Sequence, residues 1–205
     1  MGTPRLSCTR CYTPPVRPTA LRLVVLAAVI SAPPLALAYR EGPLPAMTGG
    51  FGEETCAKCH YDHPLNARGG SLLIEGVPAT YVPGREYRIT IAVSHPEAKR
   101  AGFELSVRVA DGLDKGQQAG MLRGPDALTQ IVFVPGRTVQ YLQHTKAGSD
   151  LNGRHERRWT IYWTAPPSSA GRVIFNVAAN AANDDASALG DYVYTVWRMS
   201  RPAPR

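Results

Sequence analysis

The sequence has little cysteine, little charge and no long apolar run. Only 4 of its 205 residues are Cys, and 19% are charged. So few cysteines exclude a small scaffold held together by disulfides. No period or charge excess typical of collagen, coiled coils or disordered chains is present. With 19 Gly and 18 Pro, the chain favours short strands joined by turns over long helices.

The first 38 residues differ in character from the rest of the chain. Four arginines precede an apolar run at 23–30, no acidic residue occurs before Glu41, and Ala-Leu-Ala at 36–38 has the pattern of a cleavage site. This order is typical of a secretory signal peptide. Two prolines interrupt the apolar run well before the roughly 20 residues that a membrane anchor needs. We therefore expect an exported protein whose mature chain begins at Tyr39.

Removal of residues 1–38 changes both the charge and the cysteine content. The leader holds four of the 23 Lys and Arg and none of the 16 Asp and Glu, so the formal charge falls from +7 to +3. The positive charge that would favour nucleic acid therefore lies mostly in the leader, and we expect no nucleic acid partner. Cys8 and Cys11 leave with it. The mature chain keeps Cys56 and Cys59.

These two cysteines lie in the motif C-A-K-C-H at 56–60. C-x-x-C-H is the attachment signature of c-type haem. Two thiols three positions apart on a helical turn can both form thioethers with one porphyrin, and His60 can then bind the iron as the proximal ligand. A redox pair usually sits in a βαβ pattern, which the sequence does not show, and a zinc site needs four ligands, whereas the mature chain has no second Cys pair. We therefore expect one covalent haem c on Cys56 and Cys59.

The sixth iron ligand has several candidates, because His and Met are both usual axial ligands. The mature chain offers Met47, Met121, Met199, His63, His95, His144 and His155. His63 follows His60 too closely to reach the opposite haem face easily. His155 lies in a charged segment typical of a solvated hairpin loop. The residues alone do not choose among the others.

From residue 71 onward, apolar and polar residues alternate, which is typical of half-buried strands. Val-Pro-Gly at 82–84 and 134–136 supplies turns between them. The pattern predicts eight or nine strands, at about 71–75, 86–94, 101–110, 118–122, 129–134, 137–145, 157–164, 171–179 and 191–199. Their number and spacing indicate an all-β protein, an immunoglobulin-like antiparallel sandwich. Trp159 and Trp163 are expected in its core.

Three further segments complete the predicted organisation. Residues 39–70, with the haem motif and several glycines, should form a loop and one helical turn laid against the sandwich. Residues 71–200 form the sandwich, in one globule with 39–70, and residues 201–205 form a short tail. The Asn and Asp residues between 180 and 191 are expected in loops, since these residue types favour loops over a calcium site.

Several segments of the mature chain also occur in a recognisable order. They are 51–60, 69–72, 81–84 with Tyr87, 102–105, 144–145, 159–166, 179–183 and 190–194. Together they resemble the bacterial Reeler-like, choice-of-anchor V domain proteins that begin with a C-x-x-C-H segment. The resemblance covers roughly residues 47–197. It implies an extracytoplasmic sandwich with an N-terminal haem segment, in the periplasm or outside a bacterial cell.

The resemblance also bears on the distal ligand. In the family pattern a His-Thr pair follows a Tyr-containing strand, and here that pair is His144 and Thr145. This makes His144 the first candidate. Met121, which follows a glycine that permits close approach to a ring, and His95, at a strand end, are the alternatives.

The main functional hypothesis is an exported monohaem cytochrome c that exchanges electrons with a redox partner protein. An iron with two protein ligands has no open position for a substrate, so we expect an electron carrier or a subunit of a larger assembly rather than a stand-alone enzyme. The alternative is an extracytoplasmic β-sandwich that acts as a binding or structural module of a surface or respiratory assembly. A third possibility is a peroxidase or gas sensor with a displaceable ligand. No transmembrane segment is expected in the mature chain.

Overall fold

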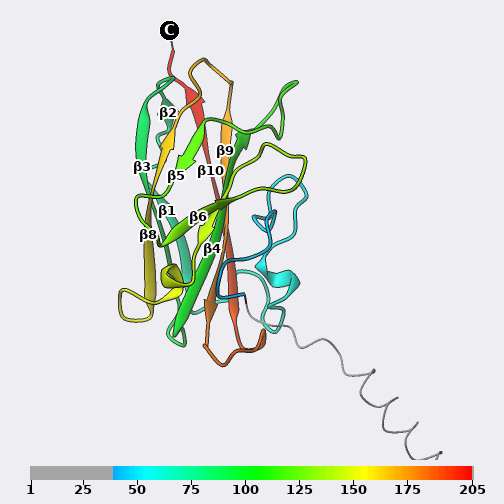
Figure 1. Ribbon diagram of the computed structural model, residues 1–205, viewed down its shortest axis with the longest axis vertical. Coiled ribbons are helices and arrows are strands. Elements are labelled where there is room, and N and C mark those ends of the chain that lie inside the picture. Colours follow the sequence, from blue (N-terminus) through cyan, green and yellow to red (C-terminus); the bar gives the residue numbers. More distant parts are fainter. Residues whose placement is uncertain (1–38, 205) are drawn as a thin grey trace, which may run out of the picture. The chain divides into compact units, whose positions relative to one another are not determined.

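The computed structural model describes residues 39–204, so the expected signal peptide at 1–38 lies outside the described residues. Two β-sheets pack around one hydrophobic core (Figure 1). The smaller sheet has the strand order β1-β3-β8-β5, and the larger sheet has the order β2-β10-β9-β4-β7-β6. The predicted all-β sandwich is confirmed.

Ten strands and two short 3-10 helices occur within residues 39–204. The strands are β1 (Ser71–Glu75), β2 (Thr80–Tyr81), β3 (Glu86–Ser94), β4 (Arg100–Val109), β5 (Met121–Arg123), β6 (Thr129–Val132), β7 (Tyr141–His144), β8 (Glu156–Thr164), β9 (Val173–Ala182) and β10 (Tyr192–Pro202). The helices are η1 (Cys56–Lys58) and η2 (Ala147–Ser149). Nine of the ten strands overlap the segments that alternation predicts.

Several predicted strands differ in their bounds by a few residues, and the main differences are the extra strand β2 and the end of β10. The unpredicted strand β2 pairs in parallel with Arg201 and Pro202, so the larger sheet is mixed rather than purely antiparallel. Two residues are too few to show an alternating pattern. Because β10 ends at Pro202, it also includes the first two residues of the segment predicted as a tail.

Two tryptophans of the core hold backbone segments in place, one of them close to the end of β7. Trp159 and Trp163 are both buried in the core, as predicted. Each indole N–H donates to a backbone carbonyl at 2.8 Å, Trp159 to Gly148 and Trp163 to Ala119. Because Gly148 belongs to η2, the first of these bonds anchors the segment that directly follows His144.

Strand β4 is almost completely buried on both faces. Phe103 and Leu105 point into the core, whereas the alternate residues Glu104 and Arg108 point to the outer face of the larger sheet. Residues 39–70 cover this outer face, and Figure 1 shows the blue and cyan segment beside β4, β9 and β10. This outer layer carries the C-x-x-C-H motif.

Candidate functional site

The C-x-x-C-H motif folds into one tight turn, as predicted. Thr55 caps η1, because its hydroxyl accepts a hydrogen bond from the amide of Ala57. The amides of Cys59 and His60 both donate to the carbonyl of Cys56, at 3.2 and 3.0 Å. Both cysteines are free thiols. The turn therefore holds the two thiols and the imidazole as one compact group.

A cleft lies between this turn and the larger sheet. It contains about 880 Å³ of space, including its open side. Cys56, Cys59, His60 and His144 all line it. Its apolar lining includes Pro43, Leu44, Met47, Ala101, Phe103 and Ala182. The structure thus brings both cysteines, the predicted proximal ligand and the predicted distal ligand to one place.

The ring of His60 is held by two residues of β9 and the β9–β10 hairpin. Its Nδ1 lies 2.7 Å from Oδ2 of Asp191, a carboxylate that is only 1% exposed. Asn180 donates to the same carboxylate oxygen at 3.0 Å. A histidine whose Nδ1–H donates to a carboxylate keeps Nε2 as the nitrogen that can bind a metal. The contact therefore fixes both the tautomer and the direction of the ring.

His144 ends β7 and is 6% exposed. Its Nδ1 lies 3.1 Å from the amide nitrogen and 3.3 Å from the carbonyl oxygen of Phe103. The amide of Phe103 donates to Nδ1 in the tautomer that carries its proton on Nε2, whereas the tautomer that donates to the carbonyl of Phe103 leaves Nε2 free to act as a ligand. Burial lowers the pKa of His144 to about 4, so the imidazole is neutral at pH 7. Neutral imidazole is the form that binds metals.

Gly102 provides the space for the His144 ring. A Cβ atom at this position would overlap the imidazole, so the ring packs directly on the backbone of β4. Gly102 has no positive φ that would explain the glycine by backbone geometry. The contact with His144 therefore requires a residue without a side chain at position 102.

The other ligand candidates are distributed differently. Met121 lies on β5 of the smaller sheet and is 66% exposed, and His95 stacks on Tyr192 with ring centroids 3.7 Å apart. Neither of these two lines the cleft. His63 stacks on Tyr192 as well, at 4.0 Å. Met47 lines the cleft together with His144.

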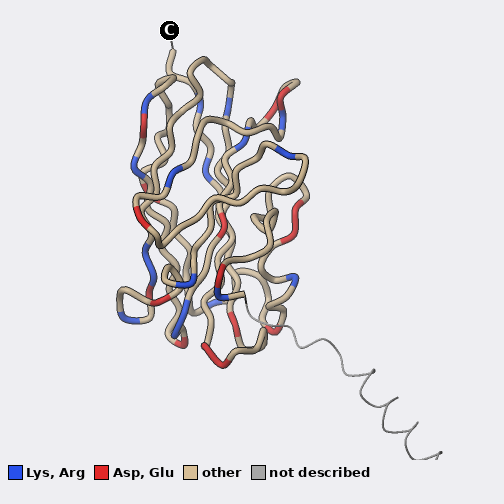
Figure 2. Tube along the Cα trace, viewed as in Figure 1, with Lys and Arg blue, Asp and Glu red and all other residues tan. Residues whose placement is uncertain are grey.

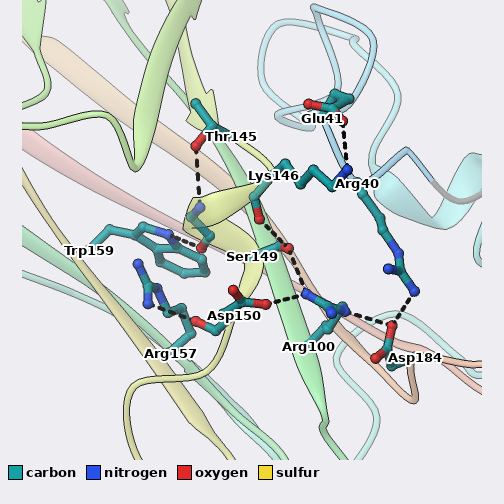
Figure 3. Close-up of polar contacts among 11 residues, drawn as sticks. Arg40, Glu41, Arg100, Thr145, Lys146, Ser149, Asp150, Arg157, Trp159 and Asp184 are labelled. Atoms are coloured by element: carbon teal, nitrogen blue, oxygen red, sulfur yellow. Dashed lines mark hydrogen bonds and ion pairs between the residues drawn. The ribbon is translucent and has the colours of Figure 1, made fainter.

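The mouth of the cleft carries paired charges, some of them in the acidic β9–β10 hairpin (Figure 2). Arg40 and Arg100 both donate to Oδ1 of Asp184, at 2.7 and 2.6 Å. Arg100 also pairs with Asp150 beyond η2. Figure 3 shows these contacts joining the N-terminal segment, β4, η2 and the hairpin. The mouth is therefore bordered by two guanidinium groups.

Sequence reasoning missed the residues that support the candidate ligands. It treated Asn180 and Asp191 as loop residues, whereas they hold the ring of His60. A proximal histidine needs a partner for Nδ1, which was a signal that such a carboxylate exists. No spacing rule identifies it, because Asp191 is far from His60 in the sequence.

Two absences apply to residues 39–204. No three His, Cys, Asp or Glu side chains converge there as a metal site made by protein ligands alone. Nor does any helix in this part of the chain have the length and apolar character needed to cross a membrane.

Comparison with known proteins finds similarity to Reeler domains. No family model matches the chain. It is 28% identical over 159 residues to Spondin-1 of Gallus gallus, which covers 71% of this chain and 19% of that protein. The chain thus spans about a fifth of the length of this curated relative.

Two solved structures are Reeler-type domains of F-spondin. The human F-spondin reeler domain aligns with 69% of this chain and 96% of its own, at 21% identity and a TM-score of 0.47. The Reelin-N domain of F-spondin aligns with 72% and 97%, at 19% identity and a TM-score of 0.46. The chain is therefore similar to Reeler domains, and the fold is a β-sandwich with a C-x-x-C-H layer outside one sheet.

Proposed function

We propose that this chain is an exported monohaem c-type cytochrome that transfers electrons to or from a partner protein. Cys56 and Cys59 hold haem c through thioethers, His60 is the proximal iron ligand, and His144 is the distal ligand. One observation carries the proposal: these four residues line the same cleft although His144 is distant from the motif in the sequence.

The residues present suit a haem. The cleft is open on one side and its lining is largely apolar, as is usual for cofactor sites. Two free thiols and two histidines are the donors that haem c requires. Arg40 and Arg100 also line the cleft, and to pair with the two propionates they would have to release or share Asp184.

The chain's own groups determine what such a cofactor does. Bound here, haem c supplies a one-electron couple. The Asp191 carboxylate holds His60 and makes its imidazole a stronger donor. The largely apolar lining limits contact with water, and two protein ligands would leave no position for substrate. These features suit electron transfer at the cleft edge rather than chemistry on a bound molecule.

His144 is proposed as the distal ligand in preference to Met47, which lines the same cleft. The ring of His144 is fixed by the end of β7, the backbone of Phe103 and the bare backbone of Gly102. Met47 lies on the N-terminal segment, where its backbone amide donates to Glu104. A ligand held by a strand end requires less ordering when it binds iron.

A second candidate function is an extracytoplasmic binding or structural module. The comparisons favour it more directly than the cytochrome, because both the sequence relative, a spondin, and the solved structures concern a Reeler-type sandwich. In that case the sandwich itself would recognise a partner in a surface or respiratory assembly, and C-x-x-C-H would be incidental.

One experiment separates the two candidates. The full chain is produced in a host that matures c-type cytochromes, and haem is detected after denaturing electrophoresis and by intact mass. The cytochrome proposal expects one haem on a chain that begins at Tyr39, with a low-spin ferric spectrum. The double variant Cys56→Ala/Cys59→Ala should lose the haem, whereas the matched control Cys8→Ala/Cys11→Ala should keep it. If the wild-type chain carries no covalent haem, the cytochrome proposal is wrong and the binding or structural module remains as the candidate function.

A further inference from the structure

A cluster of polar side chains is buried beneath the haem-binding segment, on the outer face of β4. Glu104, Ser106 and Arg108 come from β4, Thr48 and Glu53 from the N-terminal segment, and Tyr141 from β7. We call these six residues the β4 cluster. None of these six residues has a role in the proposed electron transfer.

Most of the cluster is paired internally. Arg108 forms an ion pair with Oε1 of Glu53, and the hydroxyl of Tyr141 donates to the same oxygen at 2.5 Å. Thr48 donates to the other carboxylate oxygen of Glu53 at 2.7 Å. The charges of Arg108 and Glu53 therefore cancel, and every oxygen of Glu53 has a partner.

Nε of Arg108 has no partner among the described residues, and Glu104 is the other group of the cluster that is not fully paired. Glu104 is 0% exposed, and its Oε2 accepts a hydrogen bond from the amide of Met47 at 2.5 Å. Its Oε1 is buried and has no partner among the described residues. An ionised carboxylate with an unpartnered oxygen is costly in such a place, whereas a protonated carboxyl is not.

A neighbouring strand offers a partner for that proton. Glu104 is the register partner of Gln143 on β7, so their side chains lie on the same face of the sheet. Oε1 of Gln143 is also buried without a partner. Two unpartnered acceptors on the same face of neighbouring strands can both be satisfied when one of them carries a hydrogen and their side chains meet. Protonation of Glu104 supplies such a donor.

The charged groups around Glu104 act in known directions. Burial is the main reason that the pKa of Glu104 is raised to about 8, and the charge of Glu53 raises it further. The amides of Met47 and Ala46 and the charge of Arg108 lower the pKa and offset part of this rise. Tyr141 faces it from β7, and β9 presents Ala178, which adds no charge. Glu104 makes no hydrogen bond or ion pair with His60 or His144 in the described structure.

Glu104 is also electrostatically coupled to the haem-binding turn. Burial, and after it the charge of Glu104, raises the pKa of the Cys56 thiol to about 12. Met47, whose amide donates to Glu104, lines the cleft, so a change of charge on a haem in the cleft would act on the Glu104 carboxylate through the Coulomb interaction. A ferric haem carries one positive charge more than a ferrous haem.

We propose that Glu104 takes up a proton when the haem on Cys56 and Cys59 is reduced, so that this protein couples electron transfer to proton transfer. The inference rests on the proposed cytochrome function. One electron passes from a one-electron donor protein to ferric iron, and one proton passes from solvent to the Glu104 carboxylate, where an O–H bond forms. Oxidation reverses both transfers.

The test is the pH dependence of the reduction potential, measured by spectroelectrochemistry on the matured protein. In the wild type the potential should fall by about 59 mV for each tenfold decrease in proton concentration over a window around pH 8. In Glu104→Gln that window should be flat, because the amide cannot ionise. Gln keeps the acceptor for Met47 and adds a donor for Gln143, so the variant should fold. Glu54→Gln, an exposed glutamate beside the motif, is the control and should keep the wild-type slope.

A second measurement detects the proton itself. Infrared difference spectra of reduced minus oxidised wild type should show a carboxylic-acid carbonyl band that Glu104→Gln lacks. A haem-loaded wild type with a flat potential and no such band overturns this inference alone. So does a Glu104→Gln protein that keeps both. A wild type that carries no covalent haem on the denaturing gel overturns the cytochrome proposal first, and this inference with it.

Discussion

Asp191 accepts a hydrogen bond from Nδ1 of His60 at 2.7 Å and is itself held by Asn180 and by the amide of Asn183. The carboxylate is thus fixed from two sides before it meets the imidazole. A buried, oriented carboxylate behind a ligand histidine increases the electron density at Nε2.

Asp191→Asn should raise the reduction potential of the haem. The amide is a weaker acceptor, so His60 donates less charge and ferric iron loses stability relative to ferrous iron. We expect ligand affinity for ferric iron to fall by about 10-fold. Redox titration measures the shift, with Asp185→Asn in the exposed part of the same hairpin as the control. An unchanged potential would show that Asp191 does not act through His60.

His144→Ala should convert the ferric spectrum from low spin to high spin while the covalent haem remains. Removal of the imidazole opens one axial position, but the thioethers on the cysteines are untouched. Absorption and electron paramagnetic resonance spectra report the change. Met47→Leu is the matched comparison and should stay low spin. The opposite pattern, high spin in Met47→Leu alone, would make Met47 the distal ligand.

Gly102→Ala should destabilise the protein and displace His144. The added methyl group would overlap the imidazole, and the cost of such overpacking is about 1–3 kcal/mol. Urea unfolding gives the loss of stability, and the spectrum should show a mixture of low-spin and high-spin haem. In Gly153→Ala the new methyl group meets only ordinary contacts, so this control should behave like the wild type. A fully low-spin Gly102→Ala protein would argue against the packing of His144 on β4.

Acid should weaken the haem-free fold through His144. Its pKa is lowered by burial from 6.5 to about 4, so between these values the unfolded chain binds more protons than the folded one. Stability due to this residue is therefore present above pH 6.5 and lost as the pH falls toward 4, by about 3 kcal/mol in total. The pH dependence of unfolding in Cys56→Ala/Cys59→Ala measures it.

The variant for that comparison is His144→Phe in the same background. It should lose this part of the acid sensitivity, whereas His155→Phe, in an exposed loop, should keep it. Glu104 contributes with the opposite sign, since its raised pKa makes stability fall as the pH rises toward 8. This contribution is common to both proteins and cancels in the difference. Equal slopes for His144→Phe and its parent would mean that His144 is not buried as a neutral group.

Local patterns in the sequence predicted most of the fold. The alternation of apolar and polar residues along 86–94 and 157–164 identified β3 and β8. In a strand with one buried face, successive side chains point to opposite faces, so every second residue is apolar. The motif at 56–60 likewise indicated a tight turn that carries two thiols and an imidazole. These features depend on neighbours in the chain, and so a single sequence can reveal them.

Long-range packing decided the remaining features of the candidate site. Whether His144, His95 or Met121 reaches the cleft depends on which strand ends beneath the N-terminal segment, and Asp191 meets His60 only through the β9–β10 hairpin. From the sequence, Glu104 is expected to be an ordinary strand residue that faces outward. The alternation of apolar and polar residues indicates which face of the sheet a side chain lies on, but not whether another layer covers that face. Residues 39–70 supply the cover, which changes a solvated carboxylate into a buried one that accepts a hydrogen bond from the amide of Met47.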